Sequence, residues 1–278
     1  MENGLYIVAT PIGNLSDISA RALDILKEAK IVACEDTRVT KKLFALLQIS
    51  CDKKFISYHD HNEDECSPYI IELLQSGEGV ALVSDAGSPL ISDPGYKLVK
   101  RCRDLGINVR PIPGASAVIC ALQISGLPTN RFMFAGFIPN KDSAREKLFD
   151  ELKCIDTTLV FYETAPRILK TLSVMKKYFI SREIAVAREI TKIYEECKNG
   201  SADELIAYYT EHQPKGECVI MVAPPKNAEK ISVSELEQKI KSALSTASLK
   251  DVAKNLSVEL NMNKNEIYQM GLKIKDEL

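Results

Sequence analysis

The chain has 278 residues, which is long enough for two domains of ordinary size. Its composition, 45% hydrophobic and 27% charged, is that of a soluble globular protein with a substantial core. The sequence holds no apolar run of about 20 residues, so we expect no membrane-spanning helix. A net charge of −2 means that any nucleic acid must be bound by a local basic patch.

The ends of the chain and its cysteines predict a cytoplasmic protein. Residues 1–4 lead directly into an apolar strand, without the positive segment and cleavage site of a signal peptide. Residues 275–278 match an endoplasmic-reticulum retention signal, but without a signal peptide we interpret them as a charged helix end. The eight cysteines stand singly and the three histidines show no zinc-finger spacing, so we expect reduced thiols.

Short apolar segments alternate with helical patterns through the first half of the chain. Strands are expected at residues 5–9, 31–34, 55–58, 80–84 and 108–112. Helices are expected at 22–29 (capped by Asp17 or Ser19), 40–47, 68–75 and 96–105. This alternation predicts an α/β fold with a mostly parallel sheet that is covered on both faces.

Changes in composition predict three domains. They are an α/β domain at residues 1–127, a second α/β domain at 128–225 and a small helical domain at 226–278. In the second domain we expect strands at 132–137, 157–162, 183–187 and 217–222, and helices at 144–153, 168–176 and 201–209. In the third we expect amphipathic helices at 233–244, 249–259 and 264–274, which are more typical of a small bundle than of a DNA-binding helix-turn-helix.

The signatures of several enzyme classes are missing from the sequence. The only G-x-G, at residues 77–79, precedes its strand, so it is unable to cradle a pyrophosphate at a helix start. The sequence contains no P-loop, nucleophile elbow or H-E-x-x-H motif. Nothing therefore indicates a dehydrogenase, an NTPase, a serine hydrolase or a zinc protease.

Three tight loops follow predicted parallel strands, at the sheet edge where open α/β sheets bind ligands. They are Thr10-Pro11-Ile12-Gly13-Asn14, the segment 84–95 that begins Ser84-Asp85-Ala86-Gly87-Ser88-Pro89, and Pro113-Gly114-Ala115-Ser116-Ala117. Small residues let the backbone approach a ligand closely, and an aspartate suits an ammonium or a ribose hydroxyl. The third loop opens a helix whose free N–H groups suit a carboxylate. Each loop alone is compatible with ordinary turn chemistry, but together they predict a ligand site.

Several segments, in their order and spacing, resemble one family. They are residues 8–15, Cys34-Glu35-Asp36-Thr37-Arg38, Tyr58-His59-Asp60-His61-Asn62-Glu63, 85–95, 113–116 and 188–196. Together they resemble the tetrapyrrole methylase superfamily, and within it the ribosomal RNA small-subunit methyltransferase I family. One segment departs from the pattern. Phe161-Tyr162-Glu163-Thr164-Ala165-Pro166-Arg167 stands where that family usually has F-Y-E-S-P-H-R, so no role of the family's histidine carries over to Pro166.

The resemblance implies a two-domain protein that binds S-adenosylmethionine in the cleft between its domains. It implies methylation of the ribose 2′-hydroxyl of a cytidine in the decoding region of small-subunit (16S) ribosomal RNA, by a homodimer. On the matching positions it implies cofactor contacts at Pro11, Asp85, Ala86, Gly87, Ser88, Ser116, Ala117 and Tyr162.

The chemistry of methyl transfer suggests further candidates. An activated methyl group mainly needs alignment, whereas a weakly acidic ribose hydroxyl is helped by a base. The candidate catalytic residues are Glu163, Glu189 and Lys192, and the segment 59–63 is an alternative source of the base. The candidate RNA-binding residues are Arg38, His59, His61, Asn62, Glu63, Arg167 and Arg188, with Lys192 as a further phosphate contact.

Purely structural roles for these residues are also compatible with the sequence. Glu189 could simply form an ion pair with Arg188, Lys192 or Arg167. His59, His61 and their acidic neighbours could cap a helix or bind a loop. A metal site at His59, His61 and Glu63 is rejected, because the segment is too polar for a buried strand and methyl transfer needs no metal.

Two other functions are also compatible with the sequence. The same fold could methylate a small molecule of tetrapyrrole type, although residues 34–38 and 58–63 favour RNA. A catalytically inactive RNA-binding relative is the other alternative, and the altered segment 164–166 is the feature that favours it.

Overall fold

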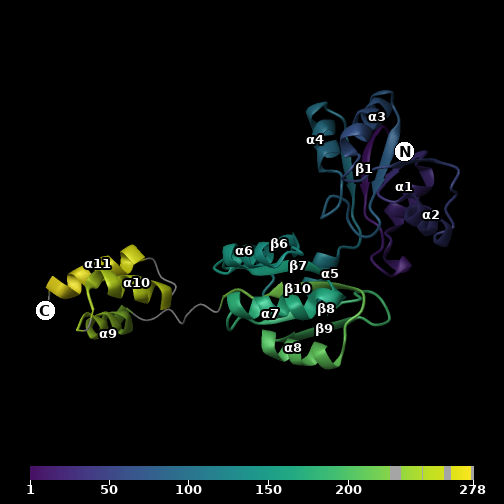
Figure 1. The fold of residues 1–278 in the computed structure, drawn as a ribbon. Helices are drawn as coiled ribbons and strands as arrows, with labels where there is room; N and C mark the ends of the chain where they lie inside the picture. The colour runs from purple at the N-terminus through teal and green to yellow at the C-terminus, as the bar shows by residue number, and fades with distance from the viewer. Residues whose placement is uncertain (226–232, 246, 260–263, 277–278) are drawn as a thin grey trace. The chain divides into compact units, whose positions relative to one another are not determined.

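The computed structural model describes residues 1–225, 233–245, 247–259 and 264–276. The chain divides into two compact units, Met1–Pro224 and Pro225–Leu278. The first unit contains two five-stranded sheets with their helices, and the described residues of the second form three helices (Figure 1).

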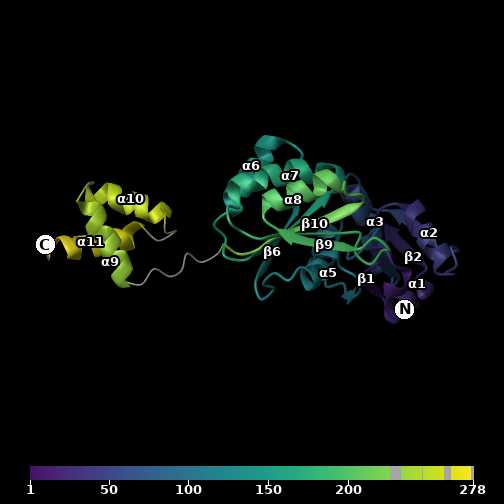
Figure 2. The ribbon, with the colours of Figure 1, turned by 90° about the horizontal axis from the view of Figure 1, so that it is seen from below.

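The first sheet is parallel throughout, as the alternation of strands and helices predicts. Its strand order is β3-β2-β4-β1-β5, and every neighbouring pair is parallel. Figure 2 labels β1 and β2 of this sheet. The strands are β1 (Gly4–Val8), β2 (Ile31–Cys34), β3 (Lys54–Ser57), β4 (Gly79–Val83) and β5 (Val109–Ile112). The carboxyl ends of these strands therefore lie along one edge of the sheet, where the three loops that are predicted to bind a ligand begin.

Helices cover both faces of this sheet. They are α1 (Ala20–Glu28) and α2 (Thr37–Leu46) on one face, and α3 (Glu63–Gln75) and α4 (Tyr96–Asp104) on the other. Successive strand residues face opposite ways, so Val32 packs with α1 and α2 whereas Ala33 packs with α3 and α4. Burial on both faces explains why these strands read as continuous apolar runs.

Helices α2 and α3 begin three and five residues earlier than the sequence patterns predict. Helix α2 begins at Thr37 because the Asp36 carboxylate accepts the Arg38 N–H at 2.8 Å and caps the helix. Helix α3 begins at Glu63, and the expected start at Pro68 was wrong, because Pro68 lies inside the helix. Three acidic residues in the first turn of α3 interact favourably with the helix dipole and offset part of the cost of that proline.

The second sheet is mostly antiparallel. Its order is β6-β7-β10-β8-β9, with only β6 and β7 parallel. The strands are β6 (Phe132–Phe137), β7 (Thr158–Thr164), β8 (Ile184–Arg188), β9 (Glu196–Gly200) and β10 (Glu217–Val222). The sequence patterns missed β9, since Glu196-Cys197-Lys198-Asn199-Gly200 lacks an apolar alternation. It is an edge strand paired only with β8, where polar residues are tolerated.

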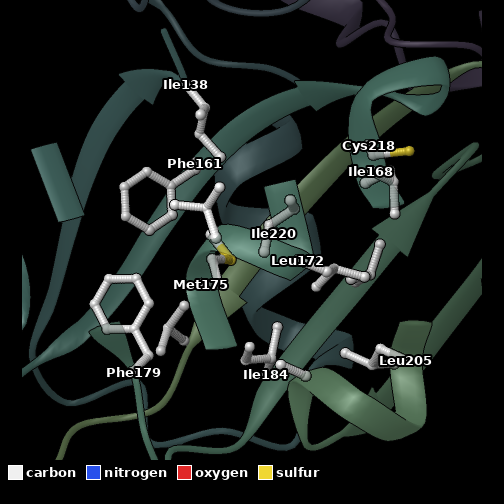
Figure 3. Packing of buried hydrophobic residues seen from close by; sticks show 14 of the residues in the cluster. Ile138, Phe161, Ile168, Leu172, Met175, Phe179, Ile184, Leu205, Cys218 and Ile220 are labelled. Carbon is white, nitrogen blue, oxygen red and sulfur yellow. The ribbon is translucent and has the colours of Figure 1, made fainter. Parts of the chain in front are cut away.

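The two faces of the second sheet carry two separate cores. Helices α6 (Asp142–Leu152), α7 (Ile168–Tyr178) and α8 (Ala202–Glu211) cover one face, where Phe161, Leu172 and Ile220 pack together (Figure 3). Helix α5 (Ala117–Ile124) covers the other face, where it packs in one apolar cluster with Val160 of β7 and Val219 of β10. Helix α5 thus packs on the second sheet although it precedes residue 128, where the composition predicts a domain boundary. That boundary stays a prediction.

The second unit is a small helical bundle. Its helices are α9 (Val233–Leu244), α10 (Leu249–Glu259) and α11 (Lys264–Asp276), close to the expected positions, and they bury Ile240, Val252 and Ile267. The expected charged helix end at 275–278 falls partly outside the described residues. In the part of the chain that the structure describes, no helix combines the length and the apolar character needed to cross a membrane.

Arg182 ties the connection between α6 and β7 to the end of β10. Its side chain is buried and donates to the carbonyl oxygens of Ala223, Lys153 (3.1 Å) and Thr157 (3.2 Å). Burial lowers the pKa of Arg182 to about 10. The guanidinium thus satisfies three carbonyl groups that would otherwise be unpaired within the protein.

Replacing Arg182 with methionine removes these donors while keeping much of the apolar stem. We expect Arg182→Met to lower the free energy of unfolding by about 3 kcal/mol, at about 1 kcal/mol for each carbonyl left unpaired. Urea denaturation measures this change. The control is Arg131→Met, whose exposed guanidinium lies 3.8 Å from Asp156 and should matter by less than about 0.5 kcal/mol. Equal losses in the two variants would contradict this view of Arg182.

Candidate functional site

A pocket of about 290 Å³ lies where the loops of the first sheet meet the second sheet. Its walls come from the segments that follow β1, β2, β4 and β5, and from β6, β7, β10 and the loop between β8 and β9. The pocket therefore stands at the carboxyl edge of the parallel sheet, where the sequence analysis expects a ligand.

Most of the predicted cofactor residues line this pocket. The lining residues among them are Asp85, Ala86, Gly87, Ser88, Ser116, Ala117 and Tyr162. Pro11 is buried and does not line the pocket, although its neighbour Ile12 does. The structure thus brings together residues from three loops and from β7, and their contact with a ligand stays a prediction.

Hydrogen bonds join the three loops into one surface. The backbone N–H groups of Thr10 and Gly87 each donate to the other residue's carbonyl oxygen, at 2.8 and 3.1 Å. Gly87 has a φ of 80°, a conformation that favours glycine. The Ser88 hydroxyl donates to the Ala115 carbonyl at 3.2 Å and so reaches the third loop.

The pocket is rich in carboxyl groups. Among its lining residues that the structure describes, the acidic ones are Glu35, Asp85, Asp93, Glu163, Glu189 and Glu217, and the basic one is Lys192. Burial raises the pKa of Glu35, Asp85 and Asp93, and the charge of Asp85 raises the pKa of the other two further. Such a site favours a cationic ligand.

Three of these acids, Glu35, Asp93 and Glu217, were not among the predicted site residues. Glu217 is the first residue of β10. Glu35 follows β2 directly, and Asp93 lies in the same loop as Asp85. Their position after the ends of parallel strands was the signal that could have identified them. The position of an acidic residue at a strand end does not show which way its side chain points, so Glu35 and Asp93 were not predicted as site residues.

An aromatic wall faces the acidic groups. The Tyr162 ring packs edge-on against Phe134 and Phe137, with ring centroids 4.8 and 5.2 Å apart. Burial raises the pKa of Tyr162 to about 12, so its phenol stays neutral at physiological pH. The lining residues Tyr162, Phe137, Ile12 and Ile190 give the pocket an apolar side.

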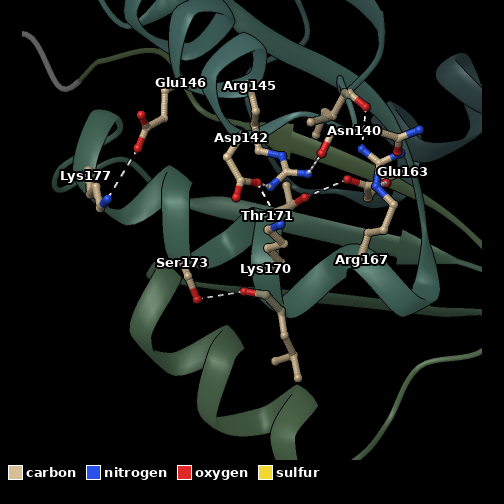
Figure 4. Close-up of polar contacts among 12 residues, drawn as sticks. Asn140, Asp142, Arg145, Glu146, Glu163, Arg167, Lys170, Thr171, Ser173 and Lys177 are labelled. Atoms are coloured by element: carbon tan, nitrogen blue, oxygen red, sulfur yellow. Dashed lines mark hydrogen bonds and ion pairs between the residues drawn. The ribbon is translucent and has the colours of Figure 1, made fainter.

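Glu163 is held by α7 and by its own strand (Figure 4). Its carboxylate accepts the Thr171 hydroxyl at 2.6 Å and the Thr164 N–H at 2.8 Å, and lies 3.1 Å from the Arg167 Nε. The side chain is fully buried on the α7 face, the face that Phe161 shares. The residue borders the pocket, but these contacts leave its carboxylate little freedom to accept a substrate proton.

Glu189 and Lys192 form an ion pair on the pocket wall. The Lys192 Nζ lies 2.9 Å from the Glu189 Oε1, and the side chains are 33% and 18% exposed, respectively. Of the three cations considered as partners of Glu189, the structure pairs it with Lys192. Arg188 instead pairs with Glu196 at 2.6 Å, and this hydrogen bond raises the pKa of Arg188.

The loop that carries this pair lies against the loop after β1. A β-carbon at Gly13 would lie 2.6 Å from the Lys192 Cγ and 3.0 Å from the Thr191 Oγ1. The first distance is shorter than real β-carbon contacts, so a larger residue at position 13 would force the Lys192 side chain to shift. This contact places Lys192 beside the pocket.

The predicted RNA-binding residues lie outside the pocket lining. They are Arg38, His59, His61, Asn62, Glu63, Arg167 and Arg188. Arg38 is 88% exposed and binds both carboxylate oxygens of Asp36, whose N–H donates to the Asp85 Oδ1 at 3.1 Å. Arg38 is therefore connected to the pocket loop through one residue. Its contact with RNA stays a prediction.

The segment 59–63 has a clear structural role at the start of α3. The Asn62 side chain accepts the His59 N–H at 2.8 Å and donates to the Ser57 carbonyl at 3.0 Å. Glu63 forms an ion pair with Lys97 at 3.0 Å. These contacts agree with the loop-binding interpretation and not with the capping one, because Asn62 stands at the N-cap of α3 without a side-chain hydrogen bond to the helix. Over the described residues, no three His, Cys, Asp or Glu side chains are grouped so that they could hold a metal ion.

Comparisons with known proteins give a consistent result. The family described as Tetrapyrrole (Corrin/Porphyrin) Methylases matches residues 4–206. A relative from Rickettsia prowazekii (strain Madrid E), described as Ribosomal RNA small subunit methyltransferase I, is 44% identical over 96% of this chain and 94% of its own. A relative from Bacillus subtilis (strain 168) with the same description is 42% identical over 95% of this chain and 92% of its own.

Solved structures share the fold at low sequence identity. A diphthine synthase aligns with a TM-score of 0.61 and 17% identity, over 79% of this chain and 89% of its own. A cobalt precorrin-4 methyltransferase aligns with a TM-score of 0.57 and 16% identity, over 79% of this chain and 94% of its own. At this identity the likeness concerns the fold alone.

The two candidate bases are expected to differ in their effect on stability. Glu163→Ala should lower the free energy of unfolding by about 3 kcal/mol, because it leaves Arg167 and Thr171 without their buried partner. Glu189→Ala should cost less than about 1 kcal/mol, because its ion pair is partly exposed. Chemical denaturation compares the two variants. Similar losses, or a larger loss for Glu189→Ala, would show that we have misjudged which carboxylate is structural.

Proposed function

The chain belongs to the ribosomal RNA small subunit methyltransferase I family of the tetrapyrrole methylases, and we propose that it methylates the ribose 2′-hydroxyl of a cytidine in small-subunit (16S) ribosomal RNA, with S-adenosylmethionine as donor. The observation that carries the proposal is the likeness to relatives of that description at more than 40% identity over nearly the whole chain. RNA is preferred to a tetrapyrrole substrate, because the likeness to cobalamin and porphyrin enzymes is below 20% identity and concerns the fold alone.

The pocket residues fit the proposed donor. S-adenosylmethionine supplies a methyl group that is already activated by a positively charged sulfur. The cationic groups of this donor suit the pocket wall that contains Glu35, Asp85 and Asp93. Its apolar parts suit the opposite, apolar wall that contains Tyr162. Ser116 makes no side-chain cap at the start of α5, and Ser116 and Ala117 both line the pocket, so the start of this helix is our proposed position for the carboxylate of the donor.

Glu189 is our proposal for the base that takes the proton of the ribose hydroxyl. Its carboxylate lies on the pocket wall and is only partly exposed, while its partner Lys192 holds it in one orientation. Glu163 is less suited, because Thr171, Thr164 and Arg167 already occupy its carboxylate. The chain therefore contributes alignment and one proton acceptor, which is what methyl transfer to a hydroxyl requires.

The net charge of the protein indicates whether free RNA or an assembled ribosomal subunit is the substrate. With a net charge of −2, the protein is unable to attract RNA strongly through its overall field, so shape must supply much of the recognition. We therefore propose the assembled small subunit, rather than free RNA, as the preferred substrate. Arg38 is exposed beside the pocket loop and is proposed to contact a phosphate. The enzyme is proposed to act in the cytoplasm as a homodimer.

Methyl transfer to ribosomal subunits tests the proposal directly. Small subunits that lack the modification are incubated with the enzyme and labelled S-adenosylmethionine, and the nucleosides are then separated. We expect label in 2′-O-methylcytidine, and a slower reaction with a protein-free 16S transcript. Label on a base, or no label in RNA, would refute the function. Equal rates on subunit and transcript would refute only the preference for the particle.

Removal of the Asp85 carboxylate tests the cofactor site. Asp85→Ala should raise the dissociation constant of S-adenosylmethionine by about 10- to 100-fold, because a contact between opposite charges is lost. Isothermal titration calorimetry without RNA measures this constant. The control is Asp156→Ala, whose carboxylate is exposed and does not line the pocket, and its constant should match that of the wild type. A wild-type constant for Asp85→Ala would exclude this residue from the site.

Replacing Glu189 with its amide tests the base. Glu189→Gln should lower the rate constant of the methyl-transfer step by at least about 100-fold, because the amide does not accept the proton. The dissociation constant of S-adenosylmethionine should change little. Single-turnover kinetics on small subunits separate the two effects. Glu163→Gln provides the comparison, and a larger rate loss in Glu163→Gln would make Glu163 the better candidate.

A further inference from the structure

The loop between β8 and β9, residues 189–195, has an unusual backbone. Glu189 has a φ of 48° and Thr191 a φ of 68°, in the left-handed region that side chains other than glycine rarely adopt. Threonine is especially disfavoured there because its β-carbon is branched. Such conformations persist only where the surroundings impose them, and they concentrate at functional sites.

Several contacts hold this loop in one shape. The Lys192 N–H donates to the Glu189 carbonyl at 3.0 Å, and the Glu195 N–H donates to the Lys192 carbonyl at 3.1 Å. The Glu195 carboxylate turns back to accept the Thr191 N–H at 2.7 Å. Ile190 is buried in the core beneath α5 and anchors the base of the loop. The loop is therefore preorganised.

This preorganised loop presents two apolar side chains to solvent. Ile193 is 94% exposed, the largest fraction among the bulky hydrophobic residues that the structure describes, and Tyr194 is 72% exposed. Both follow directly after Lys192, which lines the pocket and pairs with Glu189. Exposure of both side chains leaves apolar surface in water, which the stability of the fold does not require.

We propose that Ile193 and Tyr194 form a substrate-binding tip, in which the Tyr194 ring stacks on an unpaired nucleobase of the RNA beside the target ribose. This inference rests on the proposed function and extends it to the recognition of the substrate. A nucleobase offers a flat apolar face, and aromatic side chains bind unstacked bases by stacking on that face. Ile193 fills the space beside the ring, as apolar side chains do when they separate stacked bases.

The position of the tip favours RNA over a second copy of the chain. A stable protein interface needs a broad surface, of about 800 Å² on each partner. The tip consists of two residues between the charged side chains of Lys192 and Glu195. It also adjoins the pocket, so a nucleobase held there would keep its ribose near Glu189 and Lys192. A rigid tip loses little conformational entropy when it binds.

Substitution of Tyr194 tests the tip through the kinetics of methyl transfer to small ribosomal subunits. Stacking of one base on an aromatic ring changes affinity by about 5- to 140-fold. We therefore expect Tyr194→Ala to lower kcat/KM by a factor in this range, mainly through a higher KM. Tyr194→Phe and Tyr194→Trp should keep most of the wild-type value, because both retain a stacking ring.

The control is Ile180, which is 75% exposed in the turn after α7 and lies outside the pocket lining. Ile180→Ala should leave kcat/KM unchanged. The affinity for S-adenosylmethionine and the unfolding free energy of Tyr194→Ala should equal those of the wild type, which separates loss of stacking from damage to the pocket.

Each other outcome overturns a defined part of the argument. A wild-type kcat/KM for Tyr194→Ala, or an equal loss in Tyr194→Phe and Tyr194→Trp, refutes stacking while leaving the proposed function intact. A change in the oligomeric state of Tyr194→Ala, measured by light scattering, would instead assign the tip to a contact between two copies. A wild-type enzyme that does not methylate subunits would refute the proposed function, and the tip proposal would fall with it.

Discussion

The close contact between Gly13 and Lys192 is the constraint on which the pocket depends. Gly13 lies in the loop after β1 of the first sheet, and Lys192 lies in the loop between β8 and β9 of the second. A β-carbon at residue 13 would overlap the lysine stem, so glycine lets the two loops meet without a shift of that side chain. The meeting completes the wall that carries Lys192 and Glu189. Neither sheet forms this wall alone.

The acidic side of the pocket stores unfavourable electrostatic energy. Burial raises the pKa of Glu35, Asp85 and Asp93, and the charge of Asp85 acts in the same direction on the other two. A carboxyl group whose pKa is higher in the folded state destabilises the fold as pH rises through that raised value. At neutral pH the three charges therefore cost folding energy. A bound cation would offset this cost, so the arrangement is understandable as a site for a positively charged ligand.

The sequence predicted the repetitive parts of the fold well, because their signals are local. Apolar runs, capping residues and glycine or proline turns identified the strands of the parallel sheet and the three loops at its edge. Strand β9 was missed because an edge strand can be polar, and its pairing with β8 depends on a distant segment. Side-chain direction was also beyond reach. Glu163 was predicted as a candidate base, yet its carboxylate accepts the Thr171 hydroxyl, whereas Glu35 and Asp93, which also line the pocket, were not predicted as site residues.

Glycines on two sides explain why the Glu189–Lys192 pair has a defined geometry. The stem of Lys192 lies over Gly13, and the carboxylate of Glu189 lies against Gly216, where an added β-carbon would overlap it. Gly216 immediately precedes β10, so the pair is fixed between the first sheet and the centre of the second. The left-handed backbone of Glu189 follows from this confinement, because Ile190 must at the same time turn into the core. Packing between the two sheets thus imposes the strain of the loop, which orients a carboxylate and an amine toward the same pocket.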